Sequence, residues 1–296
     1  MKQQKQGETR VRALLELLDL ERVDTNLFLG SNESRGQYRL FGGQVLSQAL
    51  RAAYVSVADR RVHSLHGYFL RAGTAARKVL YQVDQIRDGG SFCTRRVVAR
   101  QNGEAIFTMS ASFHKQEQGF EHALAMPNVP GPQELEDDSV VAGLMADDER
   151  LSAGAVRIRP FEMRSVFPFG SPGFRADRTW NPVWIRFRDR TPVADPQLAH
   201  ALLAYASDMG MVSTASLPHQ QAVPRSRLQM ASLDHALWFH RPFDINDWLL
   251  FHKRTSMAHG SRGLVHAEFF SRDGELIASV TQEGLVRLRD AASGSK

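Results

Sequence analysis

The sequence has a single cysteine, Cys93, among its 296 residues. One thiol cannot form an internal disulfide, so the fold has to be stable without covalent cross-links, which is typical of a reducing cytoplasm. The chain also has no apolar run long enough to span a membrane, and its polar residues 1–8 lack the apolar core of a signal peptide. We therefore expect a cytoplasmic protein with no membrane insertion.

Blocks of like charge are missing as well. The chain carries 37 Lys and Arg residues against 32 Asp and Glu, a net charge of +5, but the arginines are spread along it. The lack of a basic cluster argues against a nucleic-acid partner, and a phosphorylated metabolite fits the charge better. His63 and His66 lie three residues apart on a predicted strand, so they point to opposite faces and cannot chelate one metal. We expect no metal and no cofactor.

The two halves of the sequence repeat each other. Residues 105–113 align with residues 276–284 at a shift of 171. Each of these segments follows a polar turn with Asn-Gly or Asp-Gly, which is the strongest short signal for a β-hairpin. Residues 64–71 align with residues 234–241 at a shift of 170. Because the two shifts differ by only one residue, we infer a duplication.

Each copy is predicted to pack an antiparallel sheet on a single helix, an α+β fold. The copies are expected at residues 1–116 and 156–296, joined by a linker at 117–155 that contains a proline-rich stretch and an acidic cluster. In the central helix of the second copy, Asp195 suits the N-cap, Pro196 suits the first helical position and Gly210 suits the C-terminal end. Helices are predicted at residues 9–20, from residue 42, near 140–150 and between 195 and 210. Strands are predicted at residues 61–70, 79–86, 92–101, 104–114, 161–167 and 183–188, and further strands follow up to residue 288.

Two polar residues interrupt the apolar stripes of the second copy. Gln282 stands where the first copy has Ala111, and Ser232 stands where it has Val62. Each has an ordinary explanation, since a buried Ser usually bonds a backbone carbonyl and a Gln on a strand is often a satisfied edge group. Their shared occurrence in one copy makes them candidate site residues.

A third polar residue, Asp208, lies in the last turn of the central helix of the second copy and borders the buried face of this helix. It matches Gln48 of the first copy by a looser alignment. The helix dipole disfavours a negative charge at this end, and partial burial removes water from the carboxylate. Both effects raise the pKa and make the group a better base, although an Asp near a helix end is often simply solvated.

Longer motifs resemble the acyl-CoA thioesterase II family. The resemblance covers about residues 14–287, and its most specific segments are 41–44, 63–71, 87–92, 234–243 and 282–284. It implies two fused hotdog folds, each a long helix wrapped by an antiparallel sheet, which agrees with the duplication. It also implies a catalytic Asp on the second helix, a Ser or Thr on a following strand and a Gln on the last strands, roles that fall on Asp208, Ser232 and Gln282.

The reaction implied by this resemblance is hydrolysis of fatty acyl-CoA to a free fatty acid and CoA. Asp208 would accept the proton of a water molecule held by Ser232 and Gln282. Backbone N–H groups near Gly42 and Gly43 would bind the oxyanion, because glycine lets a ligand approach the backbone closely. No covalent intermediate is required, and the sequence has no Gly-x-Ser-x-Gly elbow.

Three further residues are candidate substrate contacts. Arg262 and Gly263 follow a predicted turn and are expected to contact the CoA phosphates, although a solvated arginine is the commoner case. His66 is expected to have a supporting role at most, because a hydrogen-bonded core histidine is the usual alternative.

Two other functions fit the same sequence. A hydratase or dehydratase acting on enoyl- or hydroxyacyl-CoA is the nearest enzyme, but its chemistry needs a His beside the Asp, whereas here Asp208 is paired with Ser and Gln. A non-catalytic acyl-CoA sensor would keep the pocket without needing the carboxylate. Hotdog proteins usually assemble, so a homo-oligomer, either a dimer or a tetramer, is also expected.

Overall fold

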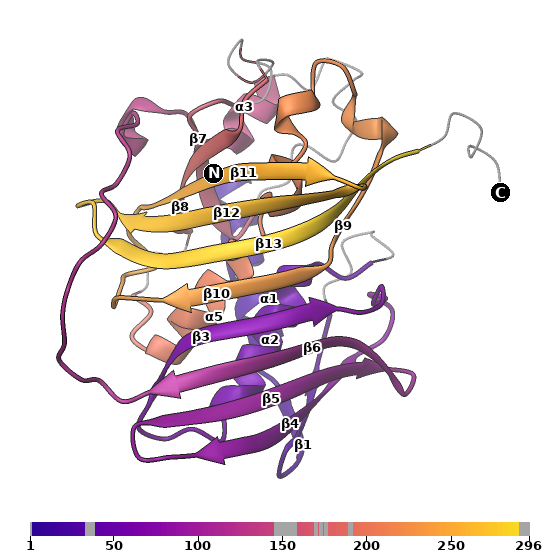
Figure 1. The fold of residues 1–296 in the computed structure, drawn as a ribbon, viewed down its shortest axis with the longest axis vertical. Coiled ribbons are helices and arrows are strands. Elements are labelled where there is room, and N and C mark those ends of the chain that lie inside the picture. Colours follow the sequence, from indigo (N-terminus) through magenta and orange to yellow (C-terminus); the bar gives the residue numbers. More distant parts are fainter. Residues whose placement is uncertain are drawn as a thin grey trace.

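The structure is a computed structural model that describes residues 2–32, 39–144, 159–168, 171, 174, 177–188 and 192–289. A single antiparallel sheet of 13 strands spans the described part of the chain, and the longest helices lie on one face of it (Figure 1). None of the helices described here is both long and apolar enough to cross a membrane.

The strands of the two copies occupy separate halves of the sheet. In the first half they are β1 (Glu21–Asp24), β2 (Leu27–Gly30), β3 (Arg61–Phe69), β4 (Val79–Asp88), β5 (Phe92–Gln101) and β6 (Glu104–His114). In the second half they are β7 (Phe161–Ser165), β8 (Trp180–Phe187), β9 (Leu228–Ser232), β10 (Asp234–Phe239), β11 (Leu249–His259), β12 (Arg262–Ser271) and β13 (Leu276–Leu288). Across the sheet the order is β1-β2-β4-β5-β6-β3-β10-β13-β12-β11-β8-β7, and β9 also pairs with β13.

Two enclosed helices form the centre of the fold. α2 (Gly42–Tyr54) packs against β4, β5 and β6, and α5 (Pro196–Ser207) packs against α2. Nearly every residue of both helices is buried. Each copy is thus a long helix covered by an antiparallel sheet, the double hotdog that the family resemblance implied. The other α-helices are α1 (Lys2–Leu18), α3 (Asp138–Leu144) and α6 (Met211–Thr214).

Most predicted elements are confirmed, and the differences lie at their ends. β5 and β6 match the predicted bounds, whereas α1 begins seven residues earlier than expected. α5 ends at Ser207, and Gly210 (φ 75°) begins α6 instead of closing α5. The β1–β2 hairpin was not predicted, because strands of four residues are too short to show a clear alternation. Residues 145–150 of the helix predicted near 140–150 lie outside the described residues.

The junction between β3 and β10 reflects the duplication. His66 is paired with Ala236 across this junction, and these two residues are equivalent under the 170-residue shift. Under the same shift, the residue pair on one side of this central pair becomes the pair on its other side. A local pseudo-twofold axis therefore passes through the centre of the β3–β10 ladder. Each copy thereby covers an edge strand of the other, which removes two exposed sheet edges.

The apolar stripes of the repeated strands are confirmed. Alternate side chains from Phe107 to Phe113 in β6 are buried, and so are those from Ala278 to Gln282 in β13. The preceding turns contain Gly103 (φ 79°) and Gly274 (φ 90°), left-handed conformations that favour glycine. Gln282 therefore does stand among core residues, with only 1% of its surface exposed.

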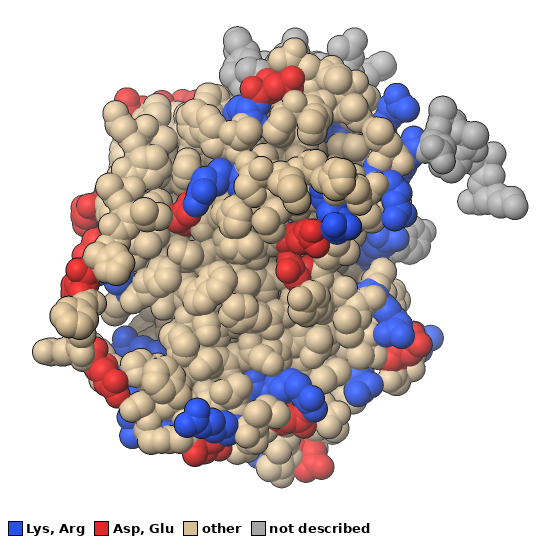
Figure 2. All heavy atoms as spheres, viewed as in Figure 1, with Lys and Arg blue, Asp and Glu red and all other residues tan. Residues whose placement is uncertain are grey.

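Charges are mixed on the outer face of the sheet. Figure 2 shows Lys and Arg next to Asp and Glu around the rim of this face, with few charges over its centre. Among the described residues that this view shows, no continuous basic surface covers the centre of this face, in keeping with the spread of arginines along the sequence.

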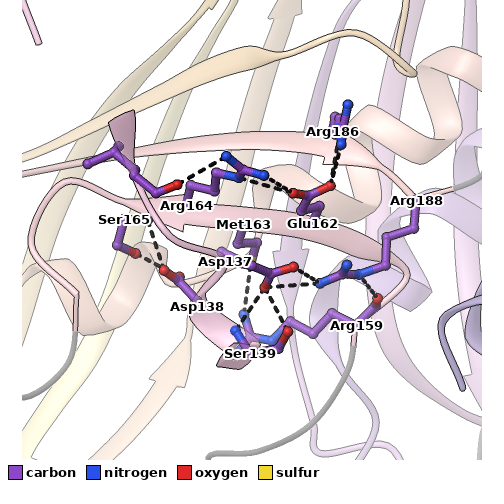
Figure 3. A network of polar contacts seen from close by, with 11 residues as sticks. Asp137, Asp138, Ser139, Arg159, Glu162, Met163, Arg164, Ser165, Arg186 and Arg188 are labelled. Carbon is purple, nitrogen blue, oxygen red and sulfur yellow. Dashed lines mark hydrogen bonds and ion pairs between the residues drawn. The ribbon is translucent and has the colours of Figure 1, made fainter. Parts of the chain in front are cut away.

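The middle of the linker, at Asp137 and Asp138, is fixed to the β7–β8 edge by polar contacts (Figure 3). Arg188 donates to the Asp137 carboxylate at 2.8 Å, and Asp138 accepts from the backbone N–H and the hydroxyl of Ser165 at 2.9 and 2.7 Å. These contacts hold α3 and the residues before it against the second half of the sheet.

Glu162 is the centre of the neighbouring ionic cluster. Its two carboxylate oxygens accept from Arg164 at 2.8 Å and from Arg186 at 2.7 Å, and both guanidinium groups lie over the ring of Trp248. Glu162 itself is 8% exposed. Its loss would remove the carboxylate partner of Arg186 and leave Arg164 with only backbone carbonyl acceptors.

We expect Glu162→Gln to lower the free energy of unfolding by about 1–3 kcal/mol, the usual cost of removing a charged hydrogen-bond partner. Urea denaturation monitored by tryptophan fluorescence measures this change. Glu104→Gln is the matched control, since Glu104 and its partner Arg71 are mostly exposed and such pairs contribute about 0–1 kcal/mol. Equal effects of the two substitutions would contradict the role given to Glu162.

Candidate active site

A cavity of about 590 Å³ opens between the two copies. The first copy contributes the start of α2 and the end of β3, and the second contributes the end of α5, α6 and β9. Asp208 and Ser232 are the polar candidates on its wall. Its apolar lining residues include Leu40, Phe41, Val45, Phe69, Leu70, Ile106, Phe107, Met211, Val212, Met230 and Leu233.

Asp208 is held at the junction of two helix ends. It is the C-cap of α5, and its Oδ2 atom accepts the backbone N–H of Gly43, in the first turn of α2, at 2.8 Å. The carboxylate from the second copy thus caps a helix of the first copy, 165 residues away in the sequence. The N-terminal end of α2 favours a negative charge there.

The structure brings the three predicted catalytic residues together. Gln282 on β13 donates from Nε2 to Asp208 Oδ1 at 3.0 Å and to Ser232 Oγ at 2.6 Å. Ser232, the last residue of β9, donates to Asp208 Oδ1 at a longer distance of 3.4 Å. The register of β9 and β13, in which Ser232 is paired with Gly284, places the hydroxyl beside the amide.

Burial raises the pKa of Asp208 from 3.8 to about 6, although hydrogen bonds from Gln282, the Gly43 N–H and Ser232 act in the opposite direction. The direction agrees with the sequence-based expectation, but the helix-dipole part of that argument was incomplete. Asp208 faces the positive end of α2 as well as the negative end of α5, so desolvation is the main cause. Such a pKa suits a general base near neutral pH.

Gly42 and Gly43 provide the space that this contact needs. A Cβ on Gly42 would lie 2.8 Å from Asp208 Oδ2, and a Cβ on Gly43 would lie 2.5 Å from the carbonyl oxygen of Tyr205. The N–H of Gly43 is already bonded to Asp208. Of the two N–H groups predicted for the oxyanion, only that of Gly42 is therefore available.

Three predicted substrate contacts do not reach this cavity. His66 lies on the outer side of the sheet, where its ring packs edge-on against Trp238 at 5.0 Å. Arg262 is paired with Glu283 at 2.9 Å. A Cβ on Gly263 would lie 2.4 Å from Cβ of Ala215, so this glycine serves the packing of α6 on β12. The sequence indicated the turn but not which side of the sheet it faces.

The cavity wall instead contains Arg39, Arg71 and Arg225. These arginines come from three separate segments of the chain, so no local sequence pattern marked them as a group.

His235 is a site residue that the sequence analysis missed. It is 1% exposed, and its Nδ1 atom lies 3.0 Å from Oε1 of Gln282. The 170-residue shift aligns His235 with Leu65, so a polar residue replaces an apolar one here, just as at Ser232 and Gln282. That signal was present in the alignment.

The predicted match between Asp208 and Gln48 is wrong. Aligning the N-caps of the two central helices, Phe41 and Asp195, pairs Asp208 with Tyr54 instead. The Tyr54 hydroxyl accepts the backbone N–H of Val62 at 2.9 Å, and Val62 is the counterpart of Ser232. Gln48 lies in the middle of α2, six residues before its last residue, Tyr54.

A second cavity, of about 600 Å³, is the pseudo-twofold counterpart of the first. Its wall contains Val62 and Phe239, the equivalents of Ser232 and Phe69. Two of its cations are paired within the protein, Lys115 with Asp59 and Arg241 with Glu121 and Glu275. The first copy has Tyr54, Val62, Ala111 and Leu65 at the positions of Asp208, Ser232, Gln282 and His235, so only the first cavity contains the hydrogen-bonded polar set.

Metal-binding side chains do not gather in the part of the chain that the structure describes, where no group of three or more His, Cys, Asp or Glu residues could hold an ion.

Comparisons with known proteins point in one direction. Residues 31–114 match the profile described as "Acyl-CoA thioesterase N-terminal domain", and residues 170–285 match the profile described as "Acyl-CoA thioesterase". Over 283 residues the chain is 38% identical to "Acyl-CoA thioesterase 2" of Haemophilus influenzae, which covers 94% of this chain and 98% of the relative.

Solved structures agree with this result. Acyl-CoA thioesterase II TesB2 from Mycobacterium marinum is 39% identical, with a TM-score of 0.77 over 96% of this chain and 99% of that chain. A conserved protein with a hot dog fold from Alicyclobacillus acidocaldarius is 20% identical, with a TM-score of 0.75 over 94% of this chain and 99% of that chain. This second likeness shows the fold alone.

The raised pKa of Asp208 predicts a pH-dependent cost to stability. The folded protein holds this proton up to about pH 6, whereas the unfolded chain releases it near pH 4. The stability that the proton provides is therefore complete below pH 4 and is lost as the pH rises through 6. Asp208→Asn cannot titrate, so the variant should gain about 2–3 kcal/mol relative to the wild type between pH 4 and pH 8.

Urea denaturation of both proteins at the two pH values measures this difference. Asp273→Asn, in the exposed turn before β13, is the matched control. A wild type and an Asp208→Asn variant with the same pH dependence of unfolding would show that burial does not perturb the carboxylate.

Proposed function

Because this chain belongs to the acyl-CoA thioesterase family and is therefore a thioester hydrolase, we propose that it cleaves fatty acyl-CoA through a water molecule activated by Asp208. The proposal rests mainly on the meeting of Asp208, Ser232 and Gln282 at a buried carboxylate on the wall of the cavity. The free fatty acid and CoA are the products.

The water binds to Oδ2 of Asp208. Oδ1 already accepts from Gln282 and Ser232, whereas Oδ2 accepts only the N–H of Gly43 among the contacts described. A carboxylate offers about four lone-pair positions, so Oδ2 keeps one for a water. The missing side chain of Gly42 leaves the approach to this oxygen open.

Ser232 and Gln282 have different tasks. Ser232 lines the cavity and can hold the water, whereas Gln282 is not among the lining residues. Both N–H bonds of the Gln282 amide are used on Asp208 and Ser232. We therefore revise the expectation that Gln282 holds the water, and give it the task of orienting the other two residues.

The reaction is a direct hydrolysis. Asp208 accepts a proton as the water oxygen attacks the thioester carbonyl carbon, and the oxyanion forms beside the first N–H of α2, that of Gly42. When the tetrahedral intermediate collapses, the carbon–sulfur bond breaks and the proton passes from Asp208 to the thiolate of CoA. Positioned base catalysis of this kind contributes about 10²- to 10⁴-fold to the rate.

The cavity suits the two parts of the substrate. Its apolar wall can hold the acyl chain, and Arg39, Arg71 and Arg225 can contact the CoA phosphates by charge-assisted hydrogen bonds. We propose these three arginines in place of Arg262, which does not line this cavity.

Three sequence-based expectations remain proposals. The first is that the two copies comprise residues 1–116 and 156–296, joined by a linker at 117–155. The other two are that the protein is cytoplasmic and that it forms a homo-oligomer. Sedimentation velocity on the purified chain measures the assembly directly.

Asp208→Asn should reduce thiol release from fatty acyl-CoA by about 10²- to 10⁴-fold, because the variant lacks the base. Free thiol is measured with a chromogenic disulfide, and acyl-CoA binding is measured by calorimetry on the same samples. A sensor would keep its behaviour in the variant, and a hydratase would deplete enoyl absorbance without releasing thiol, so either result would overturn the proposal.

A single turnover in ¹⁸O-labelled water separates direct attack by water from attack by the Asp208 carboxylate followed by hydrolysis at the Asp208 carbonyl carbon. Direct attack places the label in the fatty acid released in that turnover. An unlabelled acid, with the label later found in the protein, would show that a side chain attacks first.

Arg225→Gln should raise KM for acyl-CoA by roughly 10- to 150-fold, the effect of losing one charged hydrogen bond of about 1.5–3 kcal/mol, with kcat nearly unchanged. Arg262→Gln is the matched control, since its guanidinium pairs with Glu283 away from the cavity. Steady-state kinetics across acyl-chain lengths measure both constants. The assignment of the phosphate site would be wrong if the two variants exchanged these results.

A further inference from the structure

His235 connects the catalytic group to the interior of the second copy. It lies in β10, one residue before the Ala236–Thr281 pair that joins β10 to β13. Its Nδ1 atom lies 3.0 Å from Oε1 of Gln282, and its Nε2 atom lies 2.8 Å from Oγ of Ser207. The ring is thus fixed from both sides and does not line the cavity.

The ionised carboxylate of Asp208 sets the orientation of the Gln282 amide. A carboxylate has only acceptors, so the group facing Oδ1 must be the amide nitrogen, and the amide oxygen must face His235. A bond to that oxygen needs a proton on Nδ1. His235 is therefore required as a donor towards Gln282.

The state of the ring agrees with this requirement. Burial lowers the pKa of His235 from 6.5 to about 4, so the ring is neutral at physiological pH and carries one N–H. With the proton on Nδ1, Nε2 becomes an acceptor for the Ser207 hydroxyl. That hydroxyl has one proton and two acceptors within 2.8 Å, Nε2 and the carbonyl oxygen of Ala204. With the His235 proton on Nδ1, the hydroxyl donates to Nε2 and gives up its bond to Ala204.

The alternative arrangement reverses every bond. If Ser207 gave its proton to Ala204, the His235 proton would lie on Nε2, and the amide of Gln282 would turn its oxygen towards Asp208. Such an arrangement suits a protonated Asp208, which can donate, and repels an ionised one. The proton on His235 Nδ1 thus keeps the base ionised and the Ser232 hydroxyl oriented.

We propose that His235 is a positioning residue that holds the Gln282 amide with its N–H groups towards Asp208 and Ser232. The proposal rests on the function assigned to Asp208 above. It explains why this position is His in the second copy and Leu65 in the first. The first copy has Ala111 in place of Gln282, so there is no amide to orient.

Three substitutions test this role. His235→Leu installs the residue of the first copy and removes the donor. The amide nitrogen of an Asn at this position lies close to the place of Nδ1, so His235→Asn can still donate to Gln282. A Gln side chain places its amide near the position of Nε2, so His235→Gln contacts Ser207 instead.

The expected result is a fall in kcat of about 10- to 100-fold for His235→Leu and His235→Gln, the size seen when supporting hydrogen bonds to a reactive group are lost. KM should change by less than about twofold, and His235→Asn should recover most of the rate. The acid limb of the pH profile of kcat/KM should move to higher pH in the Leu and Gln variants. Among the described residues, the groups that lower the pKa of Asp208 are the neutral donors Gln282, Ser232 and the Gly43 N–H.

A purely structural role predicts different results. His200 is the matched control, because it is also buried and its pKa is also lowered to about 4. Its Nδ1 atom lies 2.7 Å from the Tyr54 hydroxyl, at the opposite end of the α2–α5 pair from Asp208. His200→Leu should leave the acid limb where it is. In a Gln282→Ala background, His235→Leu should cost less than about twofold more, since the amide that it orients is gone.

Each outcome decides the question. Three results would each overturn the role of His235. The acid limb could stay unchanged in His235→Leu, or the Asn and Gln variants could have equal rates. The third is that the rate losses of His235→Leu and Gln282→Ala multiply in the double variant. If the Leu variant does not fold, the Asn and Gln pair still gives the answer. Asp208→Asn with normal thiol release would instead reject the proposed function, so the two failures are distinguishable.

Discussion

The proposed active centre depends on one constraint, the burial of the Asp208 carboxylate where α5 ends and α2 begins. Burial makes the charged form costly and raises its pKa to about 6. Hydrogen bonds donated by Gly43, Gln282 and Ser232 stabilise the charged form of the carboxylate. A group left without those donors would stay protonated, and a group left in water would be a weak base.

The duplication explains why this constraint can be met. Two copies joined at β3 and β10 bring α2 and α5 together in opposite directions, so the end of one helix meets the start of the other. The arrangement creates two equivalent junctions and two cavities. Because Tyr54, Val62 and Ala111 fill the second junction, only one junction has the acceptors and donors that an ionised carboxylate needs.

The polar residues of the proposed site differ from their counterparts in the first copy. His235, Gln282 and Ser232 replace apolar residues of the first copy. With Asp208 they form a continuous chain of hydrogen bonds. Buried polar networks of this kind are costly unless every member has a partner. Their presence in a core otherwise packed with apolar side chains therefore indicates function more strongly than any single residue does.

The sequence by itself determined the duplication, most helices and strands, and three residues that meet at the site, because periodicity and turn chemistry act over short stretches of chain. Tertiary structure alone decided which side chains share the cavity. Gly43 contacts a carboxylate 165 residues away, His66 faces the outer side of the sheet, and Arg262 pairs with Glu283 instead of reaching the cavity. Such outcomes depend on how the two copies pack on each other, and no local pattern records the distance between segments that are remote in sequence.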